Sequence, residues 1–280
     1  MWKPWILARC KEVQENPDGY LDLWSREHYK STIITYGKTI QDLLIDSNRT
    51  FGIFSHNRPI AKAFLRQIKR EFESNTLLKQ AFPDVLWANP QQDAPKWSED
   101  EGIILKRTSN PKEASVEAWG LVDGQPVSKH FWGLVYDDIV VAASVTTPEM
   151  MAKTSEMMEL SYSLGSDGGV RRGIGTRYHF NDAYRQMIDR ESFTPRIRLA
   201  THDGSMLGDL AIWSRELLQD KRRDMGPYTF SCQVMQNPVA DSVMGFKREW
   251  MQFYDEEPHE IRDGLNVYLL VDAANSKRKG

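Results

Sequence analysis

Residues 18–32 read DGYLDLWSREHYKST and combine a strand pattern, a polar turn and the start of a helix. The apolar run at 21–24 ends in polar residues, and from Lys30 onward the apolar side chains follow helical spacing. This stripe comprises Ile33, Ile40 and Leu44. We therefore predict a strand, a loop and a helix in direct succession. Backbone N–H groups and the helix dipole at such a junction favour a bound phosphate.

The predicted loop contains the side chains that the phosphates of a nucleotide require. Lys30 can bind the β and γ phosphates, and the hydroxyl of Ser31 or Thr32 can contribute to a Mg²⁺ site. The glycines usual in phosphate-binding loops are missing, and Tyr29 precedes the lysine. Because Lys-Ser-Thr at a helix start also serves capping and solvation, both interpretations stay open for this segment alone. In the phosphate interpretation we expect Lys30 to be exposed.

Strand and helix patterns continue to alternate over roughly the first 180 residues. Strand patterns occur at residues 51–55, 102–105, 116–119, 132–136 and 170–175. Helical patterns follow at 60–72, where apolar residues recur at every fourth position, and near Pro148. Residues 83–98 are rich in Pro, Asn, Gln and Asp and predict a surface loop. The alternation predicts an α/β fold with a parallel sheet flanked by helices, in which ligands bind at the carboxyl ends of the strands.

A pair of carboxylates stands at the end of one of these strands. Asp137 and Asp138 directly follow the apolar run at 132–136. One acid at such a position can hold Mg²⁺ while the other orients a water molecule. The alternative is a strand that leaves the core with two solvated acids. Because parallel strands bring their carboxyl ends to one edge, the two acids together with Lys30 favour nucleotide hydrolysis over this alternative.

The overall composition sets limits on the function. The formal net charge is −3 and the sequence pI is about 6.1, so any contact with DNA must be local. Cys10 and Cys232 have no CxxC partner, and the histidines lack metal-binding spacing, which argues against zinc sites and disulfides. No apolar run is long enough to predict a signal peptide or a membrane span. These features fit a reduced, cytoplasmic compartment.

Three stretches, taken in order, resemble one protein family. Residues 18–32 resemble the deviant Walker A region of the large terminase subunits of tailed bacteriophages, with Arg26 and Lys30 as the matching positions. Residues 133–138, GLVYDD, resemble the Walker B strand of that family. Residues 174–182, IGTRYHFND, resemble its coupling segment. The order and spacing of the motifs agree with the family as well.

The resemblance implies a P-loop NTPase of the ASCE type that uses ATP and Mg²⁺. The implied phosphate-binding residues are Ser25, Arg26, Lys30, Ser31 and Thr32. Lys30 would bind the β and γ phosphates, and Ser31 would position Mg²⁺. Arg26 would neutralise charge in the transition state, either within its own subunit or on a neighbour. Tyr29 stands where many relatives have glycine, which would narrow the phosphate cradle.

The remaining implied site residues lie at the ends of other strands. Asp137 would position Mg²⁺ together with Ser31, and Asp138 would orient or activate the attacking water. Asp138 stands where glutamate is commoner, so the water must lie closer to the strand. Thr176 would sense the γ-phosphate and link its loss to subdomain movement, with Arg177 as a second coupling candidate. The other interpretation of the last two residues is a strand-end threonine and a surface arginine.

The sequence divides into three parts under this interpretation. An ATPase domain would occupy residues 1–208, and a small lid or linker subdomain with a helix at 212–223 would occupy 209–262. Residues 263–280 would form the first strand of an RNase H-like nuclease domain. Asp272 would be one carboxylate of a two-metal nuclease site. Since a single carboxylate cannot hold two metal ions, we expect no nuclease activity from this chain.

The function that the resemblance implies is an ATP-driven motor that moves double-stranded viral DNA into a procapsid. Its partners would be double-stranded DNA, the portal protein of the procapsid and the small terminase subunit. A homo-oligomeric ring in the host cytoplasm would be the working form, with no membrane association. Two alternatives stay open: another P-loop DNA enzyme such as a helicase, and a catalytically degenerate prophage fragment that serves only as a docking module.

Overall fold

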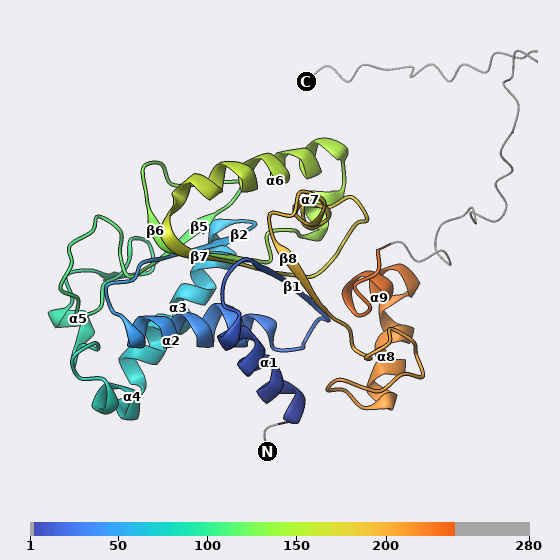
Figure 1. Cartoon of the computed structure of the whole chain (residues 1–280), viewed down its shortest axis with the longest axis horizontal. Helices are drawn as coiled ribbons and strands as arrows, with labels where there is room; N and C mark the ends of the chain where they lie inside the picture. The colour runs from blue at the N-terminus through green and yellow to red at the C-terminus, as the bar shows by residue number, and fades with distance from the viewer. Residues whose placement is uncertain (1–2, 239–280) are drawn as a thin grey trace, which may run out of the picture.

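The computed structural model describes residues 3–238, which form a mixed α/β fold around an eight-stranded sheet (Figure 1). The strand order is β3-β4-β5-β2-β6-β7-β1-β8. The strands are β1 Tyr20–Trp24, β2 Phe51–Ser55, β3 Trp97–Ser98, β4 Gly102–Ile103, β5 Val116–Gly120, β6 Phe131–Asp137, β7 Gly165–Gly175 and β8 Thr194–Arg198. The expected strand at 263–280 with Asp272, and the expected lid segment beyond residue 238, lie outside the described residues.

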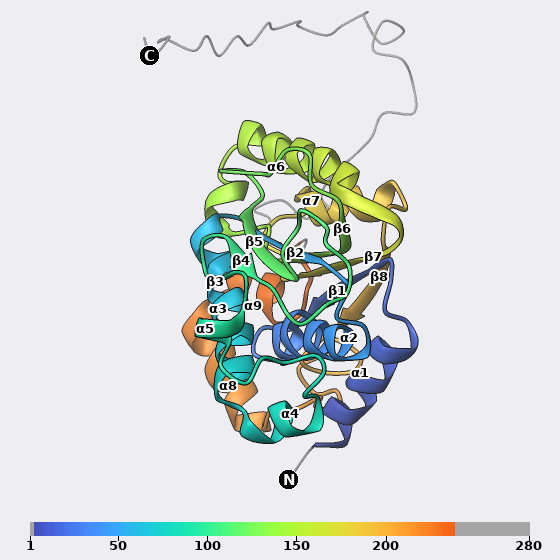
Figure 2. The ribbon, with the colours of Figure 1, turned by 90° about the vertical axis from the view of Figure 1, so that its left-hand side faces the viewer.

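Helices cover both faces of the sheet. The helical segments are α1 Pro4–Glu15, η1 Thr32–Lys38, α2 Thr39–Ile45, α3 Arg58–Ser74, α4 Thr76–Ala81, α5 Pro90–Asp93, η2 Ala142–Val145, α6 Pro148–Ser161, η3 Tyr162–Leu164, α7 Ala183–Asp189, α8 Arg215–Met225 and α9 Pro227–Gln233. Figures 1 and 2 show α1, α2 and α3 on one face, α6 and α7 on the other, and α8 and α9 near the ends of β1 and β8. No helix within residues 3–238 is long and apolar enough to cross a membrane.

The parallel sheet predicted from the sequence is confirmed. β1 runs parallel to both of its neighbours, β7 and β8, and β7 in turn runs parallel to β6. β2 is parallel to β5 and β6, whereas the short strands β3 and β4 add an antiparallel edge. The carboxyl ends of β1, β7 and β6 therefore meet at one edge of the sheet, where the predicted site residues stand.

Successive residues of β1 pack into two separate cores. Leu21 and Leu23 belong to the apolar cluster that includes Met158 of α6 and Tyr184 of α7. Trp24 belongs to the cluster on the opposite face, which α1, α2 and α3 cover. This alternation is the side-chain period of a strand that is buried on both faces. It explains why residues 21–24 are apolar apart from one aspartate.

The helix predicted after the loop begins at Lys30 but is wound differently from a regular α-helix. Residues Thr32–Lys38 form a π-helical segment before the chain continues as α2. A later helix, expected from residue 212, begins at Arg215, because the side chain of Ser214 caps it by accepting from the amide of Leu217 at 3.2 Å. Trp213 therefore lies outside the helix and is available for contacts elsewhere.

A buried ion pair connects β1 to the edge strand β8. Asp22 and Arg196 are partners in strand register, and Nε and Nη2 of the arginine donate to the two carboxylate oxygens at 2.6 and 2.7 Å. Nη1 donates to the backbone oxygens of Glu12 and Asn16. Burial raises the pKa of Asp22, and the hydrogen bonds and charge of Arg196 oppose that rise. The pair thus joins β1, β8 and α1.

We predict that Asp22→Ala lowers the free energy of unfolding by about 3–5 kcal/mol, because the buried guanidinium of Arg196 loses its carboxylate. Urea denaturation measures the change. Asp189→Ala is the matched control, since Asp189 and Arg185 form a pair in which about half of each side chain is exposed. Its loss should cost less than about 0.5 kcal/mol. Equal losses in both variants would contradict the prediction.

Candidate functional site

The loop after β1 holds a turn that usually requires glycine. Residues 25–29 connect β1 to the helix that begins at Lys30. Within this loop Glu27 and Tyr29 have φ angles of 63° and 60°. Glycine adopts this left-handed region without strain, and other residues rarely adopt it. Tyr29 therefore has the backbone conformation that glycine would supply, and its side chain is half exposed.

Lys30 lies at the junction between the loop and the helix. Its side chain is buried, with 8% of the residue exposed, so the expectation of an exposed lysine is wrong. The lysine begins a helix that packs on the sheet, and its charge lies near the buried carboxyl group of Asp137. Within residues 3–238, however, its ammonium group makes no hydrogen bond or ion pair. The positive charge is thus held next to the loop without a direct partner there.

Asp137 ends β6 and is completely buried beneath the same helix. Ser31 Oγ donates to its Oδ1 at 3.1 Å, and Thr35 Oγ1 donates to its Oδ2. Burial, followed by the charge of Asp138, raises the pKa of Asp137 to about 7, while Thr35, Lys30 and Ser31 act in the opposite direction. The structure therefore brings together three of the predicted residues. Thr35 was missed, although its spacing of four from Ser31 places both hydroxyls on one helix face.

The oxygen atoms at the end of β6 fit a magnesium ion. Carboxylate and hydroxyl oxygens are hard ligands, and Mg²⁺ commonly takes its remaining ligands from water and substrate phosphates. No group of three or more His, Cys, Asp or Glu side chains in the described part of the chain could hold a metal ion by itself. Ser31 and Asp137 thus fit a cation that is bound together with a polyphosphate.

Asp138 differs from Asp137 in its environment. It is partly exposed, and its φ angle of 50° turns the chain directly after β6. Its amide donates to the carbonyl of Ile174 in β7 at 3.1 Å, and its carbonyl accepts from the amide of His56 at 3.3 Å. These two backbone hydrogen bonds hold Asp138 between β7 and the residue that follows β2. One acid is therefore buried among hydroxyl groups, and the other can meet solvent.

Arg26 is exposed and points to partners far away in the sequence. Its Nη1 donates to Tyr178 Oη and to Gln233 Oε1, both at 3.2 Å. Neither partner was predicted, because separations of 152 and 207 residues leave no local pattern. Ser25 is fully buried, and its hydroxyl has no hydrogen-bond partner among residues 3–238. Thr32 is exposed on the first turn of the helix.

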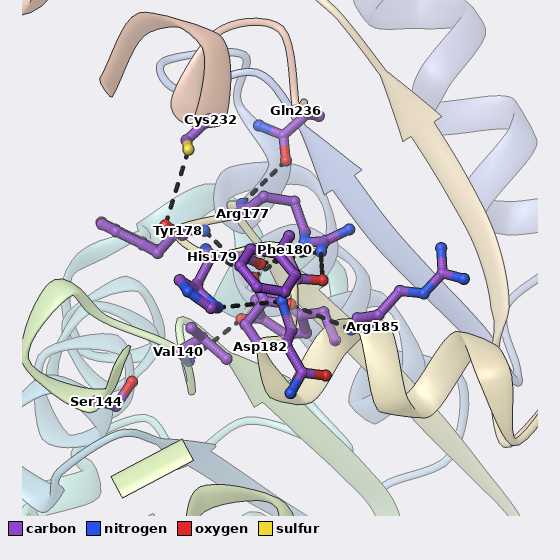
Figure 3. Close-up of polar contacts among 12 residues, drawn as sticks. Val140, Ser144, Arg177, Tyr178, His179, Phe180, Asp182, Arg185, Cys232 and Gln236 are labelled. Carbon is purple, nitrogen blue, oxygen red and sulfur yellow. Dashed lines mark hydrogen bonds and ion pairs between the residues drawn. The ribbon is translucent and has the colours of Figure 1, made fainter. Parts of the chain in front are cut away.

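The segment after β7 forms a tight loop around Arg177 (Figure 3). Thr176 directly follows β7 and is buried. Arg177 is also buried, so it is not a surface arginine. Its Nε donates to Asp182 Oδ2 at 3.0 Å, and its Nη2 donates to the carbonyls of His179 and Phe180 at 3.1 Å. The guanidinium of Arg177 thus stabilises its own loop.

A cavity of about 980 Å³ adjoins the loop. It lies between α1, the helix that follows the loop, and the residues at the start of α8, and its lining is mostly apolar. The lining includes Tyr29, Thr32, Ile33, Tyr36 and Trp213. Its volume lies at the upper end of the range for small-molecule sites. The cavity therefore has room for a ligand that extends from the loop.

His28 is buried within the loop and connects it to two tryptophans. Its ring makes edge contacts with Trp5 and Trp213, with centroid separations of 5.6 and 4.9 Å. Nδ1 donates to the carbonyl of Arg26 at 2.9 Å, whereas Nε2 is buried without a partner in the described residues. Burial lowers the pKa of His28 to about 4. No sequence pattern around His28 indicated this packing role.

The fold is similar to that of solved structures of a large terminase. The large terminase from a thermophilic bacteriophage in complex with ATP-gamma-S superposes with a TM-score of 0.50 over 85% of this chain and 53% of that chain, at 11% identity. The same terminase in complex with ADP gives a TM-score of 0.50 over 85% and 54%, at 10% identity. No protein-family model matches the sequence, and no curated protein matches it significantly.

This chain therefore shares its fold with a phage large terminase. At 10–11% identity the likeness concerns the fold, and it confirms the α/β architecture that the alternation of strand and helix patterns predicts. This chain spans about half the length of the terminase structures that it matches.

We predict that His28 makes the protein less stable as the pH falls below 6.5. The folded pKa lies below the ordinary value of 6.5, so the unfolded chain takes up the proton first as the pH falls. The contribution is present above pH 6.5 and is lost as the pH falls toward about 4. Between pH 6.5 and 5 the loss should be about 2 kcal/mol.

Urea denaturation at the two pH values measures this loss, and His28→Phe is the comparison because it keeps an aromatic ring that cannot titrate. The variant should show a pH dependence smaller by the stated amount. The same pH dependence in both proteins would contradict a buried, neutral histidine.

Proposed function

We propose that this chain is the ATP-hydrolysing motor portion of a large terminase, which moves double-stranded viral DNA into a procapsid. The observation that carries the proposal is the convergence of Lys30, the Ser31–Asp137 hydrogen bond and Asp138 at the carboxyl edge of a parallel sheet. Ligands of such sheets bind at this edge. The bacteriophage terminase of the same fold has been solved with ATP-gamma-S and with ADP, which supports a nucleotide here.

The proposed chemistry assigns one task to each of the central residues. Lys30 pairs with the β and γ phosphates, and its unpartnered charge at the loop, among residues 3–238, supports this task. Ser31 and Asp137 would hold Mg²⁺, which neutralises phosphate charge when bound. Thr35 keeps the carboxylate of Asp137 in place. Asp138, which is partly open to solvent, orients the attacking water or accepts its proton.

Arg26 is the proposed source of further positive charge in the transition state. Its hydrogen bonds go to the neutral groups of Tyr178 and Gln233, so its charge is not paired with a carboxylate in the described part of the chain. Whether it acts on the nucleotide of its own subunit or of a neighbour depends on how the subunits are arranged in the proposed ring. Ser25 and Thr32, at the two ends of the loop, complete the proposed nucleotide-binding set.

The cavity beside the loop is the proposed place of the nucleoside. Its lining includes Thr32, which directly follows Ser31, and two tyrosines, Tyr29 and Tyr36. Aromatic and apolar side chains suit the flat surface of a purine. We therefore propose that the nucleoside occupies this cavity while the phosphates stay at the loop.

The remaining proposals concern coupling, domains and partners. Thr176 would sense the γ-phosphate, since its hydroxyl makes no hydrogen bond within residues 3–238. Arg177 would hold the coupling loop in shape. Residues 1–208 would form the ATPase domain and 209–262 the lid, with the portal protein, the small terminase subunit and double-stranded DNA as partners. A homo-oligomeric ring in the host cytoplasm would be the working assembly.

ATP hydrolysis by the purified chain, with and without double-stranded DNA, tests the proposed function. We predict turnover that DNA stimulates, and its loss in Lys30→Ala because the phosphates lose their counter-charge. Lys153→Ala is the control, since Lys153 is an exposed lysine on α6, on the other face of the sheet. Unchanged turnover in Lys30→Ala would remove Lys30 from the site.

The same assay separates the alternatives. Stimulation by single strands together with strand separation would indicate a helicase. Nucleotide binding by the wild-type chain without any turnover would indicate a degenerate docking module.

We predict different defects for the two acids. Asp138→Asn should keep the affinity for ATP and Mg²⁺ but lower kcat by about 10²–10⁴-fold, because an amide cannot accept the proton of the water. Asp137→Asn should instead weaken the Mg²⁺-dependent part of nucleotide binding. Titrations of a fluorescent ATP analogue with and without Mg²⁺, together with steady-state kinetics, distinguish these defects. Identical behaviour of the two variants would show that the division of roles is wrong.

A further inference from the structure

The segment that contains α8 and α9 contacts three consecutive residues of the loop. The contacts are Arg26 N to Gln233 O at 2.9 Å, Glu27 Oε1 to Lys221 Nζ at 2.6 Å, and the ring of His28 to that of Trp213 at 4.9 Å. The loop is therefore attached to this segment along much of its length. A displacement of the loop would therefore strain these contacts or move α8 and α9 with it.

The same segment also contacts the loop after β7. Tyr228 Oη donates to the carbonyl of Tyr178 at 3.0 Å, and the thiol of Cys232 donates to the same carbonyl at 3.7 Å. Figure 3 shows Cys232 above Tyr178, with Gln236 on the same side of Arg177. The α9 region thus lies against both the β1 loop and the β7 loop.

The side chain of Gln236 bonds both to the end of β1 and to the loop after β7. Its Nε2 donates to the carbonyl of Trp24, the last residue of β1, at 3.1 Å. Its Oε1 accepts from the amide of Arg177 at 3.1 Å, directly after Thr176. The same Nε2 also donates to the carbonyl of Gln233 at 3.1 Å. One buried amide group therefore joins β1, the β7 loop and the end of α9.

The backbone of Gln236 has a conformation that residues other than glycine rarely adopt. Its φ angle is 50°, in the left-handed region, and 6% of the residue is exposed. A side chain that makes three hydrogen bonds can hold a residue in a conformation that costs free energy. Replacement would also leave the buried amide of Arg177 without its partner, which favours movement of the loop.

We propose that Gln236 is a positioning residue that makes the β1 loop and the β7 loop move together with α9 when the bound nucleotide changes. This inference rests on the proposed ATPase function. Gln236 itself does not touch the nucleotide: it keeps the Trp24 carbonyl and the Arg177 amide in one arrangement. In this arrangement Arg26 and Thr176 keep a fixed relation to the γ-phosphate.

The test is Gln236→Leu in the full 280-residue chain, a change that keeps side-chain bulk and removes the amide group. We expect kcat for ATP to fall by about tenfold or more, as displacement of catalytic groups by a fraction of an ångström predicts. The Kd for ATP-gamma-S should change by less than about threefold, because the phosphate-binding residues are intact. In the wild-type chain, hydrogen exchange of residues 226–237 should differ between ATP-gamma-S and ADP, and this difference should vanish in the variant.

Gln125→Leu is the matched control. Gln125 also donates through Nε2 to two backbone carbonyls, those of Leu121 and Met157, but it contacts neither loop. It should leave kcat and the nucleotide-dependent exchange unchanged. Gln236→Glu is the second variant if Gln236→Leu folds poorly, since it keeps an acceptor for Arg177 and lacks the donor for Trp24. It should reproduce the loss of the exchange difference.

Each outcome decides the inference. Normal kcat with a normal exchange difference in Gln236→Leu would overturn it. A proportional loss of kcat, affinity and thermal stability would also overturn it, because that pattern belongs to general destabilisation. If the wild-type chain binds no nucleotide, the proposed function fails and the inference fails with it. If the wild-type chain hydrolyses ATP and the substitution has no effect, only the inference about Gln236 is wrong and the proposed function stands.

Discussion

The candidate site depends on the insertion of β7 as a parallel strand between β1 and β6. The register pairs Leu23 with Gly175 and Asp137 with Ile174, so the loops after all three strands begin at the same level. Gly175 is required by close packing, because a Cβ there would lie 2.1 Å from Tyr184 Oη. That hydroxyl donates to the carbonyl of Ile174 at 3.3 Å. A shift of β7 by one residue would separate Asp137 from the helix that carries its two hydroxyl partners.

The sequence was sufficient for the elements with strong apolar periodicity and for the residues at strand ends. The strict four-residue stripe predicted for α3 is rotated in the structure: Ala61 and Leu65 are buried, while Ile60 remains partly exposed. A period of 3.6 residues explains this drift. β8 was missed because it is an edge strand with little apolar alternation and a proline at residue 195, which edges tolerate.

Some site residues could be predicted from the sequence, whereas most of the residues that contact them could not. Lys30 and Asp137 stand at strand–helix and strand–loop junctions, so topology alone brings them together. Thr35 could have been found from its helical spacing to Ser31. Partners such as Gln233 and Gln236 could not, because their contacts with the loops depend on how a distant helix packs. The π-helical winding of Thr32–Lys38 likewise follows from tertiary packing and not from a local signal.

The two cations at the loop, Arg26 and Lys30, make ligand binding sensitive to ionic strength. Neither Arg26 nor Lys30 forms an ion pair with a carboxylate among residues 3–238, and both stand at the end of β1. Salt screens the attraction between these two charges and a polyphosphate. The affinity for a polyphosphate should therefore fall as the ionic strength rises. Ionic strength would thereby tune how often the loop is occupied, even though the chain as a whole is slightly acidic.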